Sequence, residues 1–386
     1  MIFRKIILLF FVITLSSTAN ISSLDVKDMT LEEKIGQMIC LELRYWSSDG
    51  TAPVPVTEVS PEAIKYLKEN SIGSVILYGV NLVDIVQTVN LTTTLGSATD
   101  DPKCKPVLIM TDQEGGRVER ATFKRKPLKN NLEIETLEEA FEKGAFIGKE
   151  LKYLGINCNL APVVDVNSNP DNPIIKERSF GSNPEVVSEF SKAFVKGLHK
   201  YNIIATAKHF PGHGDTSKDS HFELPIVNKS FEELNDLEFK PFKAVIDIGI
   251  DMIMTAHIAL PKIESKTIIS KEDGQKMYIP ATLSKIILTD ILRGYLGFNG
   301  VIISDSMGMN PISKNLSPFE AAKMAINAGV DILCMPFIVR NKNDIKKIPE
   351  FIEFIKNEVL EGRILESRIN ESVERILKMK SKISTS

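Results

Sequence analysis

The segment from Lys208 to His221 holds the densest group of side chains that could do acid–base chemistry. It reads K-H-F-P-G-H-G-D-T-S-K-D-S-H and contains three of the five histidines in the chain. Two of these, His209 and His213, are four residues apart, a spacing that binds zinc when both lie on one helix. A proline and a glycine between them break any helix, so the spacing favours acid–base or polar binding roles over the zinc alternative.

Asp219 and His221 form the candidate proton-transfer pair in this segment. Two residues apart in an extended loop, their side chains point to the same side. A carboxylate that holds one imidazole nitrogen leaves the other free to give or take a proton. With an ordinary pKa of about 6.5, such a histidine can act as acid and base in alternate steps. An Asx turn beside a solvated histidine is the alternative interpretation.

Further charged side chains and imidazoles follow short apolar runs, each where a buried strand would end. Asp305 ends one such run and has no acidic residue beside it, so we expect it to be ionised. Taken singly, each residue could be a turn residue or a helix N-cap. Together they predict one polar cluster, formed by Asp112 to Glu114, Asp165, Lys208, His209, His257 and Asp305.

Eight short apolar segments alternate with helical stretches, which is the pattern of βα units around a parallel sheet. Eight is the number of strands that closes a barrel, and barrel enzymes place their active sites at the C-terminal strand ends. We therefore predict an α/β fold, a single (β/α)8 TIM-type barrel with long active-site loops. The segments are 36-GQMICLEL, 73-GSVILY, 106-PVLIMT, 158-CNLAPVV, 203-IIATAKHF, 252-MIMTAH, 300-GVIIS and 331-DILCMP.

The helices between these segments carry start signals. A capping side chain precedes a proline at three places, which predicts helix N-termini at Pro61, Pro184 and Pro318. Amphipathic spacing predicts further helices over residues 136–154, 230–249, 283–296 and 349–379, the last broken near Gly362. Two irregular stretches, 211–228 and 262–281, are long enough to be functional loops.

The N-terminus has the composition of a signal peptide. Arg4 and Lys5 precede a mostly apolar run from Ile6 to Leu15, and small residues follow up to Ala19. We predict a signal peptide over residues 1–19, an exported protein in the periplasm or outside the cell, and one catalytic barrel domain over residues 20–386. An uncleaved anchor is the alternative, and no later run of 18 apolar residues predicts another membrane segment.

Charge and cysteine content narrow the functional classes. A net charge of -3 without a basic run gives no footprint for nucleic acid, so a small soluble ligand and a monomer are expected. Of the four cysteines, Cys40, Cys158 and Cys334 lie in apolar runs, which favours buried thiols over a disulfide framework. Cys104 lies outside such a run.

The chain resembles the β-N-acetylhexosaminidases of glycoside hydrolase family 3. The resemblance rests on 111-TDQEGGRVER, 178-RSFG, 208-KHFPGHGDT with 219-DSH, 281-ATLS and 298-FNGVIISDSMGM, all in family order. It extends from about Leu31 to Lys380. The sequence departs from the family pattern at Ser306 and at Glu223, and its segment from Glu264 to Tyr278 is longer than usual.

The resemblance implies a role for each matching residue. Asp305 would be the nucleophile, and His221, assisted by Asp219, the acid/base. The residues implied to bind the sugar are Asp112, Arg120, Arg178, Lys208 and His209.

The resemblance and the residues together predict a retaining β-N-acetylglucosaminidase. It would hydrolyse terminal β-linked N-acetylglucosamine from peptidoglycan fragments or chitooligosaccharides through a covalent glycosyl-enzyme, with no metal or organic cofactor. One alternative is a phosphorylase, because an imidazole base does not repel an incoming phosphate. The other alternative is a barrel that binds sugar without catalysis.

Overall fold

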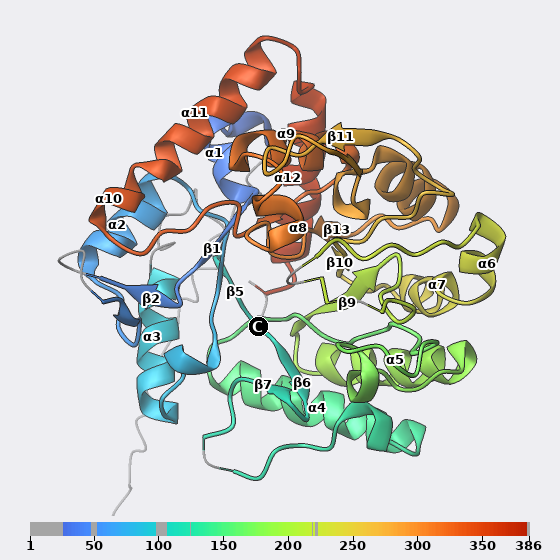
Figure 1. Cartoon of the computed structure of the whole chain (residues 1–386). Coiled ribbons are helices and arrows are strands. Elements are labelled where there is room, and N and C mark those ends of the chain that lie inside the picture. Colours follow the sequence, from blue (N-terminus) through green and yellow to red (C-terminus); the bar gives the residue numbers. More distant parts are fainter. Residues whose placement is uncertain are drawn as a thin grey trace, which may run out of the picture.

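The computed structural model describes residues 26–47, 52–97, 106–123, 125–217, 219–220 and 223–383. Within these ranges, eight parallel strands form the centre of the molecule (Figure 1), and each of the eight predicted segments contains one of them. In chain order they are β1 (Ile39–Glu42), β4 (Ser74–Ile76), β5 (Leu108–Thr111), β8 (Cys158–Asn159), β9 (Ile204–Phe210), β10 (Met252–Thr255), β13 (Val301–Ile303) and β14 (Leu333–Cys334).

These strands curve into a nearly closed barrel. Their order in the sheet is β13-β10-β9-β8-β5-β4-β1-β14, and every neighbouring pair is parallel. A parallel bridge between Ile303 and Ile332 joins β13 to the residue before β14. The Ile332 amide donates to the Ile302 carbonyl at 3.0 Å, and the Ser304 amide donates to the Ile332 carbonyl at 3.0 Å. The predicted eight-stranded α/β barrel is thus confirmed.

Helices surround the strands, as Figure 1 shows, and follow them in the expected alternation. The longer ones are α1 (Leu31–Gln37), α2 (Pro61–Glu69), α3 (Ile85–Ser97), α4 (Leu137–Tyr153), α5 (Pro184–His199), α6 (Phe231–Asp236), α7 (Phe239–Asp247), the π-helix η6 (Ile286–Tyr295), α9 (Pro318–Ala328), α11 (Lys347–Leu360) and α12 (Glu366–Lys380). Short turns of helix are η1 (Val26–Asp28), η2 (Gly79–Asn81), η3 (Asn131–Glu133), η4 (Lys176–Arg178), η5 (Ala281–Leu283), α8 (Asn310–Ser313) and α10 (Lys342–Ile345).

The three predicted capping signals are confirmed. The side chains of Ser60, Asn183 and Ser317 accept hydrogen bonds from the first turns of α2, α5 and α9, each with a proline in that turn. The continuous helix predicted over residues 230–249 is wrong, because the chain forms α6 and α7 with a break at Leu237. Pro241 lacks the N–H that an unbroken helix would need there, and instead lies in the first turn of α7.

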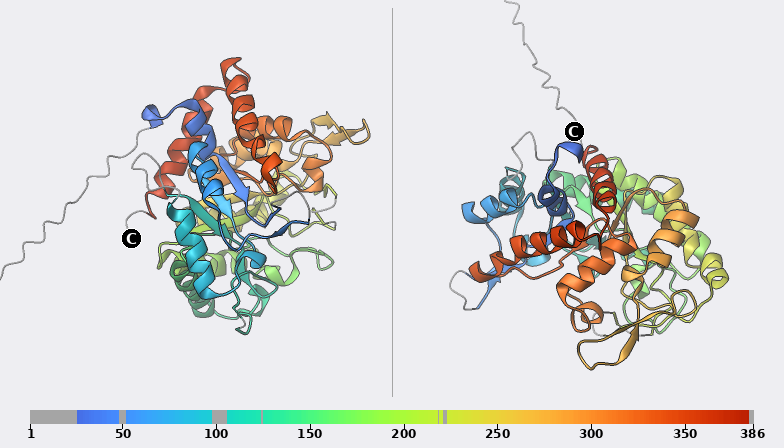
Figure 2. Two further views of the ribbon diagram at one scale, coloured as in Figure 1. Left: turned by 90° about the vertical axis from the view of Figure 1, so that its left-hand side faces the viewer. Right: turned by 90° about the horizontal axis from the view of Figure 1, so that it is seen from above.

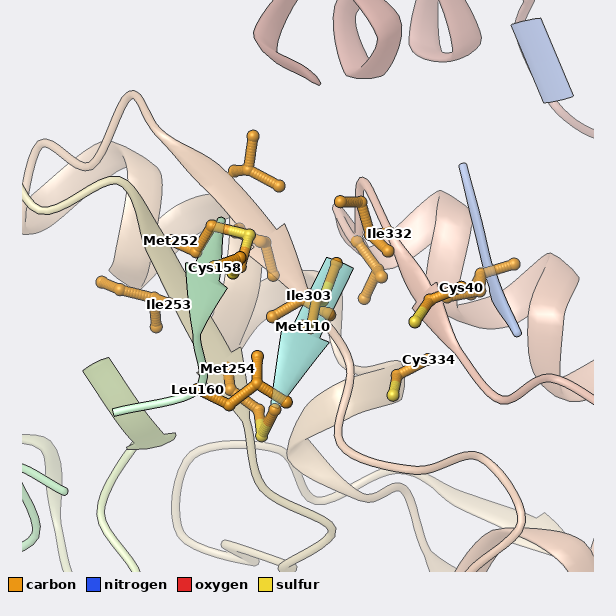
Figure 3. Packing of buried hydrophobic residues seen from close by; sticks show 14 of the residues in the cluster. Cys40, Met110, Cys158, Leu160, Met252, Ile253, Met254, Ile303, Ile332 and Cys334 are labelled. Carbon is orange, nitrogen blue, oxygen red and sulfur yellow. The ribbon is translucent and has the colours of Figure 1, made fainter. Parts of the chain in front are cut away.

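The barrel interior is filled by aliphatic and sulfur-containing side chains. Figure 3 shows Met110, Cys158, Met252 and Ile303, which come from four strands, directed into this core. Cys40, Cys158 and Cys334 are buried free thiols, as predicted. Cys104 lies outside the described residues. Burial raises the pKa of the Cys158 thiol well above its ordinary value.

Short antiparallel hairpins lie outside the eight-stranded sheet of the barrel. They pair β2 (Tyr45–Trp46) with β3 (Val54–Pro55), β6 (Gln113–Gly115) with β7 (Val118–Glu119), and β11 (Thr267–Ile269) with β12 (Lys276–Tyr278). The stretch predicted as an irregular loop over residues 262–281 is thus largely a hairpin, which projects from the molecule in Figure 2. Among the described helices, none is both long and apolar enough to cross a membrane. The predicted signal peptide, residues 1–19, lies outside the described residues.

Candidate active site

A cavity of about 460 Å³ opens where the barrel strands end, and it collects most of the predicted site residues. Asp112 and Glu114 follow β5, Lys208 and His209 lie near the end of β9, and Asp305 follows β13. Arg120 and Arg178 also line this cavity. These seven residues span 194 positions of sequence, from 112 to 305, yet the barrel brings them to one end.

A cluster of ion pairs forms one wall of the cavity. The Lys208 ammonium, only 2% exposed, lies 2.8 Å from Asp112 Oδ1 and 2.7 Å from Glu114 Oε1. Arg178 donates to both oxygens of Glu114, from Nε at 2.9 Å and from Nη2 at 2.8 Å. Arg120 Nη2 is 3.9 Å from Asp112 Oδ2. Two carboxylates, the buried Lys208 ammonium and the largely buried Arg178 guanidinium therefore hold one another in fixed positions.

Electrostatics keep Glu114 and Lys208 charged. Burial alone would raise the pKa of Glu114, but the charges of Arg178 and Lys208 outweigh it and hold that pKa well below its ordinary range. Burial alone would likewise lower the pKa of Lys208, and the carboxylates of Asp112 and Glu114 raise it above its ordinary value instead. Charged donors and acceptors are thus available to sugar hydroxyl and carbonyl oxygens.

His209 is fixed by the carboxylate of Asp165, which follows β8. Its Nδ1 lies 2.7 Å from Asp165 Oδ2, and Arg178 Nη2 approaches its Nε2 at 3.5 Å. Since a guanidinium can only donate, Nε2 is the accepting nitrogen and Nδ1 carries the proton. Burial would raise the pKa of Asp165, but His209 and His213 outweigh it and lower that pKa.

His213 serves the architecture of the loop after β9. The Nε2 of its ring lies 2.8 Å from Ser220 Oγ, and its Nδ1 lies 2.8 Å from Thr216 Oγ1. Burial lowers the pKa of His213 to about 4, so the ring is neutral near pH 7. Both ring nitrogens of His209 and of His213 have protein partners, which argues against the zinc alternative. Within the described ranges, no three His, Cys, Asp or Glu side chains group as a metal site.

Asp305 is half-buried at the cavity surface, one residue beyond the buried Ser304. Its Oδ1 accepts a hydrogen bond of 2.7 Å from the Ser306 amide, which fixes the rotation of the carboxylate. The strand end beneath it is tied to β14, because the Cys334 amide donates to Ser304 Oγ at 2.9 Å and the Met307 amide to the Cys334 carbonyl at 2.9 Å. A carboxylate so anchored has the rigidity that a nucleophile needs.

The proton-transfer pair is only partly described. Asp219 is half-buried, and its carbonyl accepts from the Glu223 amide at 3.1 Å. Its neighbour Ser220 lines the cavity. His221, the predicted acid/base, lies outside the described residues, and its role stays a prediction.

The cavity is also lined by residues that the sequence analysis did not predict. Arg44, after β1, stacks its guanidinium 3.5 Å from the ring centre of Tyr78, after β4. Arg340 Nη2 pairs with Glu42 Oε1 at 3.1 Å. Glu42 ends the apolar run of β1, so the strand-end rule that selected Asp305 could have found it. Arg340 lies in a loop after β14 and carried no such signal.

A nearly closed parallel barrel with charged residues converging at its strand ends is the arrangement of a barrel enzyme. A carboxylate held at the cavity surface, with donors for hydroxyl groups lining the same cavity, suits chemistry on a sugar. The fold and the cavity of the described residues thus define the class of the molecule as a barrel enzyme suited to chemistry on a sugar.

Residues 30–379 match the family model described as the glycosyl hydrolase family 3 N terminal domain. The chain belongs to this family. It is 36% identical over 372 residues to beta-hexosaminidase A of Pseudoalteromonas piscicida, covering 93% of this chain and 62% of that protein. It is also 36% identical over 282 residues to a beta-hexosaminidase of Tolumonas auensis, covering 72% of this chain and 79% of that protein.

Solved structures give the same relationship. A glycoside hydrolase family 3 beta-N-acetylglucosaminidase from Paenibacillus sp. str. FPU-7 superposes with a TM-score of 0.79 at 36% identity, covering 92% of this chain and 63% of that one. The beta-glucoside phosphorylase BglX superposes with a TM-score of 0.76 at 26% identity, covering 93% of this chain and 60% of that one. This chain thus spans less than two thirds of the length of several relatives.

Proposed function

We propose that the protein is a retaining β-N-acetylglucosaminidase that removes terminal β-linked N-acetylglucosamine from an oligosaccharide. The observation that carries the proposal is Asp305, a strand-end carboxylate held by the Ser306 amide at the surface of the sugar-sized cavity. The names of the beta-hexosaminidase relatives support it.

The proposed reaction has two displacements. In the first, an oxygen of Asp305 bonds to the anomeric carbon while the glycosidic C–O bond breaks and His221 gives its proton to the departing oxygen. In the second, His221 takes a proton from water, whose oxygen displaces Asp305 and releases the sugar with its original β-configuration. Asp219 holds His221 in the correct tautomer.

In this proposal, the ion-pair cluster around Lys208 binds the sugar. Lys208 and Arg178 can donate to sugar oxygens, while Asp112 can accept from sugar hydroxyls because 18% of its side chain remains exposed. Glu114, whose side chain is 1% exposed, acts behind them as the anchor of both cations. His209 presents its accepting Nε2 at the same cavity.

Substitution of the nucleophile tests the proposal. Asp305→Ala should abolish turnover of an aryl N-acetylglucosaminide, since no covalent intermediate can form. Asp290→Ala, at an exposed position on η6, is the matched control and should retain wild-type turnover. Wild-type activity in the Asp305 variant would overturn the assignment.

The acid/base assignment has its own test. His221→Ala should lose much more activity on substrates with poor leaving groups than on activated aryl glycosides, because only the former need a proton. Equal losses on both would contradict an acid role for His221.

Phosphorolysis is the second candidate, supported by the similarity to the beta-glucoside phosphorylase. Inorganic phosphate would then accelerate turnover and yield a sugar 1-phosphate, whereas a hydrolase gives free N-acetylglucosamine at an unchanged rate. A barrel that only binds sugar would show neither product.

The natural substrate and location complete the proposal. We expect peptidoglycan fragments or chitooligosaccharides as substrates, a monomer in solution, and export through the signal peptide of residues 1–19. Product analysis on both glycans separates the substrates, and N-terminal sequencing of the exported protein tests cleavage after Ala19.

A further inference from the structure

We infer that His257 is a positioning residue that sets the orientation of the Asp305 nucleophile through the backbone of Ser306. The inference rests on the proposed function, because it assigns a role within that same reaction. His257 lies two residues after β10 and contacts Ser306, which lines the cavity.

Ser306 is the residue through which the nucleophile is held. Its amide donates to Asp305 Oδ1 at 2.7 Å, so the direction of that N–H sets the plane of the carboxylate. The Ser306 carbonyl accepts from His257 Nε2 at 2.9 Å and from the Met309 amide at 3.1 Å. Both polar groups of one residue are thus bonded, and its backbone torsions are fixed on either side of the α-carbon.

The imidazole of His257 is itself rigid. It is fully buried, and a carbonyl can only accept, so the ring donates to Ser306 from Nε2. Its Nδ1 lies 2.8 Å from the hydroxyl of Thr282, in the turn η5. That hydroxyl also lies 3.0 Å from the Ala256 carbonyl and 2.8 Å from Thr255 Oγ1, so it is tied to β10.

His257 adds a third hold on the chain around Asp305, beside the bonds of Ser304 and Met307 to Cys334. Gly308, two residues beyond Ser306, is exposed, and the segment leaves the barrel there to form α8. β13 ends at Ile303, so no strand pairing extends to Asp305 or Ser306. His257, which is itself held by Thr282 of η5, therefore supports the Ser306 carbonyl three residues beyond the end of β13.

Loss of the bond between His257 and Ser306 should displace the Asp305 carboxylate. A nucleophile displaced by about 1 Å from the reacting carbon loses roughly a hundredfold in rate, because the near-attack arrangement is lost. Loss of the His257 bond should therefore slow attack by Asp305 without changing how tightly the sugar binds.

The experiment compares two amides of different reach at this position. The amide nitrogen of His257→Gln can take the place of Nε2, whereas that of His257→Asn reaches only as far as Nδ1. The probe is a 5-fluoro N-acetylglucosaminyl fluoride: Asp305 bonds to the anomeric carbon, fluoride leaves, and the fluorinated sugar stays attached. Intact mass spectrometry follows this labelling over time.

We expect His257→Asn to lower the maximal labelling rate about a hundredfold with the half-saturating probe concentration unchanged. His257→Gln should recover most of that rate, which a merely space-filling role would not produce. Because fluoride needs little protonation, the effect reports on the nucleophile and not on the acid. Equal rates for Asn, Gln and wild type would overturn the inference.

Two further outcomes keep the test decisive. Absence of labelling in the wild-type protein would refute the proposed function itself, separately from the role of His257. If His257→Asn does not fold, Thr282→Val and Thr282→Ser replace it. The valine, which lacks the hydroxyl partner of Nδ1, should lower the maximal rate while the serine retains it, and equal rates in these two variants would overturn the inference.

Discussion

Removal of the Lys208 ammonium should destabilise the protein by leaving two carboxylates without their shared cation. Lys208→Met introduces an unbranched side chain one atom shorter than lysine, and it removes the ammonium with its charge and its hydrogen-bond donors. In the wild type this ammonium lies within 2.8 Å of both Asp112 and Glu114, and it is 2% exposed. After the substitution, Glu114 keeps its two bonds to Arg178, whereas Asp112 keeps, among the described residues, Arg120 at 3.9 Å as its cationic partner.

The expected magnitude follows from these remaining contacts. Breaking a buried ion pair by removing one partner costs about 3–5 kcal/mol. The low end applies here, about 3 kcal/mol, because Arg178 still neutralises Glu114 and Asp112 is partly solvated. At roughly 2 °C per kcal/mol for a large domain, the Tm should fall by about 6 °C. Lys65→Met, which breaks the exposed pair with Glu69, is the control and should cost less than about 1 kcal/mol.

Urea unfolding of a double-mutant cycle is the assay. Lys208→Met with Asp112→Asn removes both charges, so the double variant should be more stable than the sum of the single changes by about 1–3 kcal/mol. The glutamate position stays wild type throughout, which isolates the Asp112 contact. Additive single and double effects would refute the reasoning that the ammonium and Asp112 stabilise each other.

Three other predictions concern the residues around the site. The pKa of His213 in the folded protein, about 4, lies below its ordinary value of 6.5, so the unfolded chain binds more protons than the folded protein between pH 4 and pH 6.5. The free energy of unfolding should therefore fall as the pH falls from 6.5 to 4. His213→Asn should flatten this pH dependence of unfolding. Gly214→Ala would place its Cβ 1.7 Å from the Val166 carbonyl oxygen and should cost about 3 kcal/mol or more, whereas Gly96→Ala, with nothing within 4 Å, should be neutral or stabilising in thermal unfolding. The high pKa of the buried Cys334 thiol should prevent iodoacetamide labelling at pH 8 until urea is added, as read by peptide mass spectrometry.

The barrel was predictable because periodic apolar runs carry their own signal. Each of the eight runs contains a buried strand, and parallel strands buried on both faces read as near-continuous apolar sequence. The ends of individual helices were less predictable than the strands. The break between α6 and α7 depends on Pro241 in the first turn of the second helix, and a window of amphipathic spacing passes over it.

The site was predictable where its residues lie at or just beyond the ends of strands. Asp112, Lys208, His209 and Asp305 all meet at the cavity for this reason. Arg340 was missed because its place depends on the path of the loop after β14, which no local pattern encodes, whereas Arg44 directly follows the first apolar run and the strand-end rule could have found it. The partners of His257 were also beyond reach, since Thr282 and Ser306 are 25 and 49 residues away in the chain.

Asp112 and Glu114 lie two residues apart, and this spacing in extended backbone creates the charge network around Lys208. The residues leave β5 in extended backbone, where side chains two apart point to the same side. Both therefore reach Lys208, while the intervening Gln113 turns away and accepts from the Arg120 and Ala121 amides at 2.8 Å and 3.0 Å. The same short motif thus orients a carboxylate toward the cavity, anchors the cations beside it, and fixes the turn that carries Arg120 back to the cavity. A one-residue insertion between Asp112 and Glu114 would turn one carboxylate away from Lys208, which is why the spacing matters as much as the residue types.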